Sequence, residues 1–425
     1  MPAGRAVAVI GGGWAGLAAA IEATRRGDRV TLFEMAPQLG GRAREVVVEG
    51  LALDNGQHIC IGAYRETLGL LREIGIAEAD VFMRTPLRLM GADGAGLALR
   101  GGPPMLAFAA AVLRHPTWRW REKIALLGAA GGWLTSGFRC DPLLTVARLT
   151  IDLPPVVRAE LIEPLCVAAL NTAADAASAR VFLRVLGDAL FGGRGSADLL
   201  LPRVSLSETL PAPAARWLDG AHAAIRLRHR VDSLAADGDA WRVDGERFEA
   251  AVLAAAPPES ARLARPIAPA WADATMELQY EPIVTVYMRS PATVLPEPML
   301  ALRGDAANPA QFVFDRGQLG GPAGLLAFVA SGAGAWVEAG AASTLAATRR
   351  QAESALGRWL RAPLEAVQVV TERRATFRCT PDLHRPGLNI ARRLCAAGDH
   401  VDGPYPSTLE GAVRSGLAAA RALWQ

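Results

Sequence analysis

Residues 6–34 read AVAVIGGGWAGLAAAIEATRRGDRVTLFE and decide how the rest of the chain is interpreted. The apolar run Ala6–Ile10 is typical of a fully buried parallel strand, and Leu17–Arg26 has the alanine and leucine content of a helix. A glycine–aspartate turn then leads into Arg29–Phe33, which is expected to be a second strand. The stretch therefore predicts one strand–loop–helix–strand unit, around which we expect the remaining chain to be arranged.

The loop of this unit has the spacing of a dinucleotide-binding fingerprint. Gly11 permits the tight turn, Gly13 lets a pyrophosphate approach the backbone, and Gly16 lets the helix lie close to the sheet. Trp14 and Ala15 open the helix, where free N–H groups can bind phosphate. A glycine-rich turn alone is a weak signal, but strand, loop and helix are all present, so the pattern predicts a bound dinucleotide.

The second strand is followed by Glu34, about 20 residues beyond the glycine-rich loop. A carboxylate at this position can accept hydrogen bonds from the ribose hydroxyls of adenosine. Its negative charge argues against a 2′-phosphate and therefore against NADP. From this unit alone, both NAD and FAD fit.

The composition indicates a globular protein. With 425 residues of which 51% are hydrophobic, the chain can bury large cores, and its length suggests two or about three domain-sized units. The 45 basic and 42 acidic residues leave a net charge of only +3, too small to indicate a nucleic-acid partner.

Cysteine usage and the amino-terminal sequence favour a cytoplasmic protein. The five cysteines have no CxxC spacing, so we predict neither a metal site nor a disulfide framework. The first strand begins within a few residues of Met1, which leaves no room for a signal peptide. No apolar run reaches the roughly 18 residues that span a bilayer, so we expect any membrane contact to be peripheral, at the inner face.

A second glycine-rich loop follows Glu34. Residues 40–43 read GGRA, and Arg42 is close enough in sequence to reach the same pyrophosphate. This segment resembles the GGR loop of flavoproteins in the amine oxidase and phytoene desaturase superfamily. The resemblance implies that Gly41 and Arg42 contact FAD.

The next segment resembles a narrower family. Residues 53–64 read LDNGQHICIGAY, which is similar to the LDNGQH segment of the hydroxysqualene dehydroxylases, also described as squalene-associated FAD-dependent desaturases. The Asn-Gly turn lets His58 project toward a flavin, although a buried histidine with only a structural role is the alternative. We take His58 as the first candidate proton donor, followed by Tyr64 and Tyr405.

Two apolar stretches are expected to belong to the substrate region. Residues 103–138 combine apolar blocks with a Trp- and Arg-rich segment and predict two helices broken at Pro116. They suit either an interfacial membrane anchor or a helix pair packed inside the substrate domain. Residues 161–172, LIEPLCVAALNT, resemble another family segment and are expected to line the lipid pocket, with Cys166 as inert packing.

Further elements follow from the pattern of apolar and β-branched residues. The expected helices are Ser207–Leu218 and Ala342–Leu360. The expected strands are Ala224–Leu227, Trp241–Val243, Ala251–Ala256, Pro282–Met288, Gln311–Phe314 and Leu325–Ser331.

The carboxyl-terminal sequence carries a second strong signal. A short apolar strand ends in Gly398 and Asp399, and Ser407 and Glu410 have the spacing of a capping box for a helix that continues to about Trp424. The family resemblance implies that Gly398 and Asp399 contact the ribityl-phosphate part of FAD. It also implies that the backbone N–H of Leu409 meets the pyrimidine edge of the flavin, and that Val231 contacts the adenine through its backbone.

The resemblance covers nearly the whole chain and implies an α/β fold, with a discontinuous Rossmann-like FAD-binding domain into which an α+β substrate domain is inserted. We expect the FAD-binding domain to comprise residues 1–80, 205–280 and 391–425. Residues 81–204 and 281–390 are then expected to form the substrate domain.

The resemblance implies reductive removal of the hydroxyl of hydroxysqualene, a hydrophobic isoprenoid, to give squalene for hopanoid or related triterpenoid biosynthesis. No second GxGxxG pattern is evident, so we expect a separate electron donor or reductase. A carotenoid-type desaturase and a flavin amine oxidase are the alternatives, the latter disfavoured because only four tyrosines are available for an aromatic cage.

Overall fold

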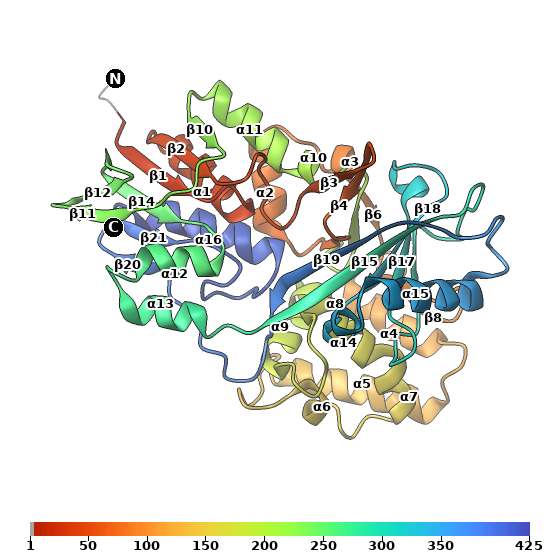
Figure 1. Ribbon diagram of the computed structural model, residues 1–425. Helices are drawn as coiled ribbons and strands as arrows, with labels where there is room; N and C mark the ends of the chain where they lie inside the picture. Colours follow the sequence, from red (N-terminus) through yellow and green to blue (C-terminus); the bar gives the residue numbers. More distant parts are fainter. Residues whose placement is uncertain (1–3) are drawn as a thin grey trace.

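The computed structural model describes residues 4–425, and it confirms the amino-terminal unit (Figure 1). Strand β1 (Ala6–Ile10) is fully buried, helix α1 (Trp14–Arg25) follows, and β2 (Arg29–Glu34) pairs with β1 in parallel. On its other side β1 pairs in parallel with β14 (Ala250–Leu253). Burial on both sides explains why β1 is apolar throughout.

This unit is the centre of a six-stranded sheet with the order β10-β2-β1-β14-β21-β20. The parallel strands β10 (Ala224–Leu227) and β21 (Leu394–Ala396) come from distant parts of the chain, and β20 (Asn389–Ala391) adds an antiparallel edge. The α/β class predicted from the sequence is therefore confirmed, while the exact domain boundaries stay a prediction.

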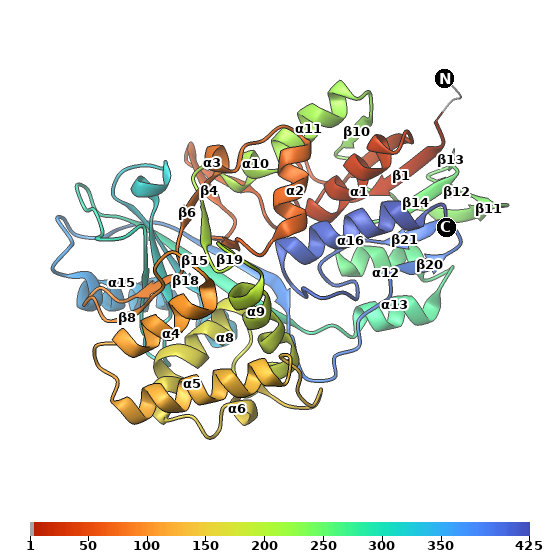
Figure 2. The same ribbon diagram turned by 180° about the vertical axis from the view of Figure 1, so that it is seen from behind.

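The two faces of this sheet are covered differently. Val7 and Val9 point toward α1 and α16 (Leu409–Ala422), which lie side by side (Figure 2). Alternate β1 residues pack instead against a small antiparallel sheet. Its strands are β11 (Leu234–Asp237), β12 (Ala240–Val243) and β13 (Glu246–Phe248).

A second large sheet is antiparallel and has the order β16-β17-β18-β15-β19. Its long strands β15 (Tyr280–Arg289) and β19 (Glu365–Phe377) run from this sheet toward the six-stranded sheet (Figure 1). The shorter strands are β16 (Met299–Ala301), β17 (Phe312–Asp315) and β18 (Leu325–Ala330). Helix α15 (Ala341–Leu356) and α14 (Gly334–Ala339) pack against it.

Short strands connect the two large sheets. Hairpin β3 (Glu45–Val48) and β4 (Leu51–Asp54) precedes the three-stranded sheet β5-β9-β6. The strands of the three-stranded sheet are β5 (Cys60–Ile61), β9 (Leu199–Pro202) and β6 (Phe82–Thr85), and β7 (Arg88–Met90) and β8 (Gly96–Ala98) form a separate two-stranded sheet.

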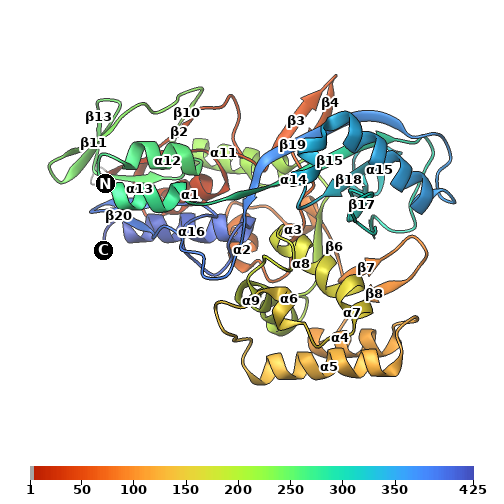
Figure 3. The same ribbon diagram turned by 60° about the horizontal axis from the view of Figure 1, so that its bottom comes forward.

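A layer of helices covers the end of the molecule away from the six-stranded sheet (Figures 1 and 3). The predicted helix pair around Pro116 is confirmed as α4 (Pro104–Arg114) and α5 (Trp120–Thr135). The layer also contains α6 (Val146–Leu149), α7 (Pro155–Val157), a π-helical turn Arg158–Ile162, α8 (Glu163–Leu170) and α9 (Ala179–Phe191).

Two predicted boundaries are wrong for reasons of proline chemistry. The single helix expected over residues 207–218 is two helices, α10 (Leu206–Thr209) and α11 (Pro211–Gly220), because Pro211 starts a new helix. Similarly, the strand expected to reach Ala256 ends at Leu253, and Pro257 begins α12 (Pro257–Ala264). The remaining helices are α2 (Arg65–Glu73), α3 (Glu78–Val81) and α13 (Pro269–Met276).

Among the helices of residues 4–425, none combines the length and apolarity that crossing a bilayer requires. The same residues bring together no group of side chains able to hold a metal ion. All five cysteines are free thiols, and Cys166 is completely buried in the helical core with its pKa raised to about 12 by burial.

Candidate functional site

The glycine-rich loop has a geometry that only glycine allows at two positions. Gly11 has a φ of +113°, and a Cβ there would lie 2.5 Å from the carbonyl oxygen of Ala254. A Cβ on Gly16 would lie 1.8 Å from the carbonyl oxygen of Gly11, so α1 could not approach the turn. Gly11 and Gly16 therefore fix the close contact between strand and helix that the sequence predicts.

The second glycine loop lies directly beside the first. Gly40 donates its N–H to the carbonyl of Gly12 at 2.8 Å, and a Cβ on Gly13 would meet only the Cα of Gly41, at 3.8 Å. Gly13 is the N-cap of α1 and has no side chain to satisfy the first N–H groups of that helix. The amino terminus of α1 thus offers backbone donors at the junction of both loops.

Trp14 and Glu34 hold this junction in place. The Trp14 ring is buried and its Nε1–H donates to the carbonyl of Ala43 at 3.3 Å, so Trp14 and Ala15 can meet a ligand only through their backbone. The Glu34 carboxylate, at the end of β2, accepts from the N–H groups of Gly12 and Ala36, both at 2.7 Å. Glu34 therefore stands beside the glycine-rich loop, as the fingerprint predicts.

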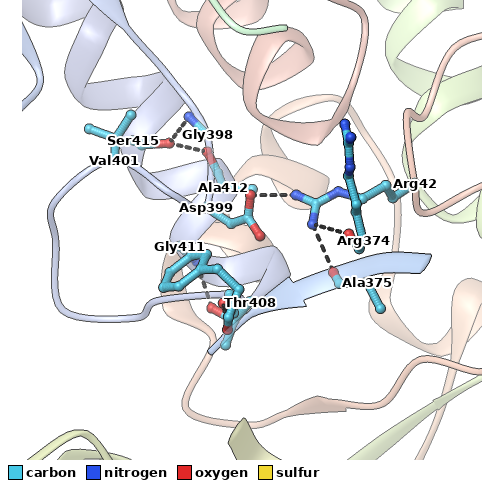
Figure 4. Close-up of polar contacts among 12 residues, drawn as sticks. Arg42, Arg374, Ala375, Gly398, Asp399, Val401, Thr408, Gly411, Ala412 and Ser415 are labelled. Carbon is cyan, nitrogen blue, oxygen red and sulfur yellow. Dashed lines mark hydrogen bonds and ion pairs between the residues drawn. The ribbon is translucent and has the colours of Figure 1, made fainter. Parts of the chain in front are cut away.

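Arg42 and Asp399 meet although 357 positions separate them (Figure 4). Nη2 of Arg42 donates to Oδ1 of Asp399 at 2.5 Å, and its Nη1 donates to the carbonyl of Ala375 at 2.7 Å. Burial by itself lowers the pKa of Arg42, but the charge and hydrogen bond of Asp399 outweigh burial and the net shift is upward. This ion pair joins the amino-terminal loop to the carboxyl-terminal strand.

The carboxyl-terminal helix is capped differently from the prediction. The N-cap is Thr408, whose Oγ1 accepts from the N–H of Gly411 at 2.9 Å. Ser407 has a φ of +55°, and its hydroxyl donates to the carbonyl of Phe377 at 3.2 Å. Leu409 is the first residue of α16, so its N–H has no partner within the helix, as the predicted ligand contact requires.

Glu410 turns away from its own helix, which is why no capping box forms. Its carboxylate accepts from the N–H groups of Glu66 at 3.1 Å and Thr67 at 2.9 Å, at the amino terminus of α2. Arg414 donates its Nε–H to the same carboxylate at 2.8 Å. The free N–H groups of α2 therefore bind the carboxylate that sequence spacing assigned to α16.

Gly398 and Val231, two further predicted contacts, lie in loops that follow different strands of the six-stranded sheet. Gly398 follows β21, and its N–H donates to the hydroxyl of Ser415 on α16 at 2.8 Å (Figure 4). Val231 lies in the loop between β10 and β11, and its buried side chain packs in the core below the six-stranded sheet. Its carbonyl accepts from Nη2 of Arg262 at 2.6 Å.

His58 is held as a neutral hydrogen-bond acceptor. Its Nδ1 lies 2.8 Å from the carbonyl oxygen of Gly56, which can only accept, so Nδ1 carries the hydrogen and Nε2 presents a lone pair. Burial is the main cause that lowers the pKa of His58. The imidazole is therefore neutral at pH 7 and does not serve as a ready source of a proton.

Tyr64 and Tyr405 lie together, with their ring centroids 6.5 Å apart in an edge-to-face arrangement. Burial raises the pKa of Tyr64. The hydroxyl of Tyr405 donates to Oδ2 of Asp188 at 2.6 Å, and burial is the first cause of its raised pKa. Cys60, Glu410 and Tyr405 are the groups that act electrostatically on Tyr64, whereas the charges that act on His58 are those of Arg42 and Glu372.

Sequence reasoning missed two buried polar groups, one on Gln57, next to His58 in the chain, and one on Tyr280, which is close enough to Arg42 for that charge to act on its hydroxyl. Gln57 accepts from Nη1 of Arg316 at 3.1 Å, while its Nε2 is buried without a protein partner. The buried hydroxyl of Tyr280 also lacks a partner, and burial raises its pKa to about 12. Gln57 belongs to the quoted LDNGQH segment, but Tyr280 comes from β15, more than 200 residues away, and no local pattern marks it.

These groups fit FAD. The loop glycines leave the amino terminus of α1 open to a phosphate, and Glu34 stands where a ribose would need acceptors. The unpartnered atoms of Gln57, Tyr280 and His400 are buried polar groups of the kind that a polar ligand satisfies.

Comparison with known proteins agrees with this geometry. The family model for flavin containing amine oxidoreductase matches residues 14–424. A hydroxysqualene dehydroxylase from Rhodopseudomonas palustris is 30% identical over 438 aligned residues, covering 98% of this chain and 97% of that protein. A hydroxysqualene dehydroxylase from Sinorhizobium fredii is 27% identical, covering 97% of each chain.

A similar structure has also been solved. An oxidoreductase from Methanosarcina mazei has a TM-score of 0.73 at 13% identity, covering 98% of this chain and 100% of that chain. At this identity the likeness concerns the fold. It confirms that both large sheets and the helical layer belong to one shared architecture.

Proposed function

This chain belongs to the family of flavin-containing amine oxidoreductases, and we propose that it reductively removes the hydroxyl of hydroxysqualene to form squalene. The protein is an FAD-dependent oxidoreductase. The observation that carries the substrate proposal is its similarity to hydroxysqualene dehydroxylases along nearly the full length of both chains. The product would then enter hopanoid or related triterpenoid biosynthesis.

FAD, when bound, supplies hydride transfer at its isoalloxazine ring. We propose that the loop glycines and the first N–H groups of α1 hold its pyrophosphate, with Glu34 on the adenosine ribose. Arg42 and Asp399 would bind near the phosphate and ribityl groups, and Leu409 would donate its N–H to the pyrimidine edge. The proposed contacts are Gly11, Gly13, Trp14, Ala15, Gly16, Glu34, Gly41, Arg42, Val231, Gly398, Asp399 and Leu409.

The reaction consumes one hydride and one proton and releases water, so the residues must position a hydroxyl and deliver a proton to it. We propose that Nε2 of His58 accepts the hydrogen of the substrate hydroxyl and orients it, because His58 is neutral with Nδ1 as the donor. Tyr64 and Tyr405 remain candidate acids, and Tyr280 keeps its proton at neutral pH and can donate a hydrogen bond.

The role of His58 is tested by His58→Ala. Loss of the acceptor should lower kcat/KM by about tenfold to a hundredfold, because a buried hydroxyl left without its hydrogen bond costs about 1–3 kcal/mol. His58→Gln, which keeps an acceptor, should recover part of the activity. Anaerobic turnover is measured alongside the flavin absorbance, and full activity of His58→Ala with normal flavin content would mean that His58 is only structural.

The proposed reaction is tested by reducing the purified FAD-loaded protein anaerobically and adding hydroxysqualene. Reoxidation of the flavin with stoichiometric formation of squalene is expected. A parallel sample with oxidised flavin and phytoene tests the carotenoid-type desaturase, and one with alkylamines tests the amine oxidase. If detergent-dispersed hydroxysqualene leaves the flavin reduced, the proposed reaction is wrong.

Two further proposals concern partners. We propose that a separate reductase or diffusible donor reduces the flavin, because the chain has one GxGxxG pattern. We also propose a cytoplasmic protein with peripheral contact to the inner face of the membrane, where a hydrophobic isoprenoid substrate would reside.

A further inference from the structure

Helices α4 and α5 lie at the end of the molecule away from the six-stranded sheet (Figure 3). Large apolar side chains of these helices are exposed. Within the described chain, half of the 14 exposed large hydrophobic residues fall between positions 105 and 143. Four of these side chains have exposed fractions above 60%: Leu106 at 61%, Trp120 at 67% and Ile124 at 65% on the two helices, and Leu143 at 66% in the segment after them. Such a concentration is typical of a surface that binds a partner.

The exposed positions of α5 follow helical spacing. Trp120, Ile124, Gly128, Gly131 and Leu134 are exposed and recur every three or four residues, which places them in one stripe. The helix has no charged residue from position 124 to its end, and α4 has none before its last residue. The outer surface of this layer is therefore apolar along most of both helices.

Buried contacts hold the loop between α4 and α5, so the two helices and their exposed apolar side chains keep fixed positions relative to each other. Nζ of Lys123 on α5 donates to the carbonyl of Leu113 on α4 at 2.8 Å. In the connecting loop, His115 stacks on Trp118 with the ring centroids 3.9 Å apart. Nε1 of Trp118 donates to Oε2 of Glu160 at 2.8 Å.

Positive charge accompanies the apolar stripe. From Arg100 through Arg139, with both ends counted, the sequence has six lysine and arginine residues and one acidic residue, whereas the net charge of the whole chain is only +3. The acid, Glu122, accepts from the N–H of Arg119 at 2.6 Å and serves the start of α5. Arg114, Arg119 and Arg121 are exposed around Trp120, which suits a surface with anionic groups above an apolar interior.

We infer that the α4–α5 face docks onto a lipid bilayer that contains anionic headgroups, with Leu106, Trp120 and Ile124 in the acyl boundary and the arginines against the lipid phosphates. This deepens the membrane contact in the proposed function and rests on it for the identity of the lipid-dissolved substrate. A bilayer explains the apolar stripe and the surrounding positive charge together.

A cavity of about 180 Å³ opens at the amino-terminal end of α4, at the edge of this face. Its lining includes Leu87, Leu99, Gly101, Pro104 and Ala107. Leu87 also packs against both the helical core and the apolar core on one side of the five-stranded sheet. Docking would bring this opening to the lipid surface, from which an isoprenoid could enter.

The inference is tested by flotation of the FAD-loaded protein with phosphatidylcholine vesicles and with vesicles containing phosphatidylglycerol. We expect binding to the anionic vesicles that weakens as salt is raised. The double variant Trp120→Glu/Ile124→Glu should abolish flotation. Arg119→Gln/Arg121→Gln should weaken binding to anionic vesicles by roughly tenfold or more, since each arginine near such a surface contributes about fivefold.

Matched variants on other faces provide the control. Met276 and Val294 are also exposed, at 53% and 63%, and Met276→Glu/Val294→Glu should float like the wild type. Flavin absorbance and the melting temperature verify that each variant is folded.

Three results would overturn the docking inference. The first is that the wild type does not float with anionic vesicles. The second is that Met276→Glu/Val294→Glu loses flotation as fully as Trp120→Glu/Ile124→Glu does. The third is a wild-type dimer in solution that Trp120→Glu/Ile124→Glu dissociates, which would make the face a self-association surface. Turnover of hydroxysqualene in detergent is measured separately. Flotation without turnover would reject the proposed substrate and leave the docking surface supported.

Discussion

At the scale of single residues, His400 couples stability to pH. Its ring is 2% exposed, and burial lowers its pKa to about 4. In the unfolded chain the pKa of a histidine is about 6.5. Between this pH and about pH 4, His400 binds a proton in the unfolded chain but not in the folded protein, so the free energy of unfolding falls as the pH falls. Between pH 7 and pH 5 this group should remove about 2 kcal/mol from the free energy of unfolding.

His400→Asn should therefore flatten the pH dependence, whatever it does to stability at pH 7. The measurement is urea denaturation at pH 7 and pH 5, compared with the wild type. His222→Asn is the matched control, because His222 is exposed and its φ of +61° is tolerated by asparagine. Parallel pH profiles for the wild type and His400→Asn would contradict this prediction.

Asn171 is a second residue with a strong expected effect. It ends α8 with a φ of +46°, and its Nδ2 donates to the carbonyl of Glu281 at 3.1 Å and to the hydroxyl of Thr376 at 2.9 Å. Its Oδ1 accepts from the N–H of Gly332 at 2.7 Å. One side chain thus joins the helical layer to β15, β19 and the loop after β18.

Asn171→Ala should lower the free energy of unfolding by about 3–4 kcal/mol, from three lost hydrogen bonds and a left-handed backbone that alanine disfavours. Asn171→Gly tolerates the backbone and should cost about 1 kcal/mol less. Denaturant midpoints test both variants, and equal stabilities for alanine, glycine and wild type would refute the bridging role.

At the same scale, the limits of sequence reasoning are visible in particular side chains. Cys166 is packed in the helical core, as predicted, and the lipid-pocket role of residues 161–172 stays a prediction, whereas the buried bridge made by Asn171 has no local signal in the sequence. Gly11 and Gly16 could be predicted because their role is local and set by spacing. The Arg42–Asp399 ion pair could not be read from a pattern, since its partners come from opposite ends of the chain.

At the scale of elements, Glu410 links α16 to α2. Its carboxylate is fully buried and takes hydrogen bonds from the N–H groups of α2 and from Arg414. Glu410→Gln replaces one acceptor oxygen by an NH2 group, which cannot accept a hydrogen bond from the N–H groups it meets. The substitution also leaves Arg414 without its ion pair. We expect a loss of about 3 kcal/mol, as for a broken buried pair.

The control for this prediction is Glu66→Gln, in the first turn of α2. Glu66 contributes its backbone N–H to the contact, so removing its side-chain charge should cost at most about 1 kcal/mol. Thermal and chemical unfolding of both variants is the measurement. Equal effects would mean that the negative charge at α2, rather than the contact with α16, stabilises the protein.

The capping of α16 shows why element boundaries are harder to predict than elements. Ser407 and Glu410 have the correct spacing for a capping box, but Thr408 caps the helix and Glu410 serves α2. Sequence spacing shows only which N–H groups of its own helix a side chain can reach. The N–H groups that the Glu410 carboxylate binds depend also on which other helix terminus packs nearby. The helix itself was predicted correctly because its apolar face is long and periodic.

At the scale of the whole molecule, we propose that the cavity beside α4 is the route by which the proposed substrate enters. Gly101 lines this cavity, and a Cβ on it would meet no atom within 4 Å. Gly101→Trp should lower turnover of vesicle-borne hydroxysqualene by about tenfold or more, corresponding to at least ~1.4 kcal/mol in kcat/KM, while vesicle binding is retained.

Gly220→Trp is the matched control, since Gly220 is exposed with open space around it on α11, away from the cavity. The measurement compares turnover in vesicles with flotation for both variants. Undiminished turnover by Gly101→Trp would show that substrate takes another route.

The α/β fold class could be predicted from the sequence, but the strand order of the second large sheet could not. The six-stranded sheet follows from the fingerprint and from a parallel strand preceding Asp399. The order of the five-stranded sheet had no comparable local signal, because its pairings join residues up to 97 positions apart, as for Tyr280 and Phe377.

The ion pair between Arg42 and Asp399 bears on how the protein is made. During translation β1, α1 and β2 leave the ribosome first, and β21, with Asp399 and α16 after it, begins 360 residues after the end of β2. Until then β14 lacks its neighbour β21, and α1 lacks the helix that packs beside it. We therefore expect a chain that stops before Asp399 and α16 to be colourless, because the proposed flavin contacts of Asp399 and Leu409 have not yet been made.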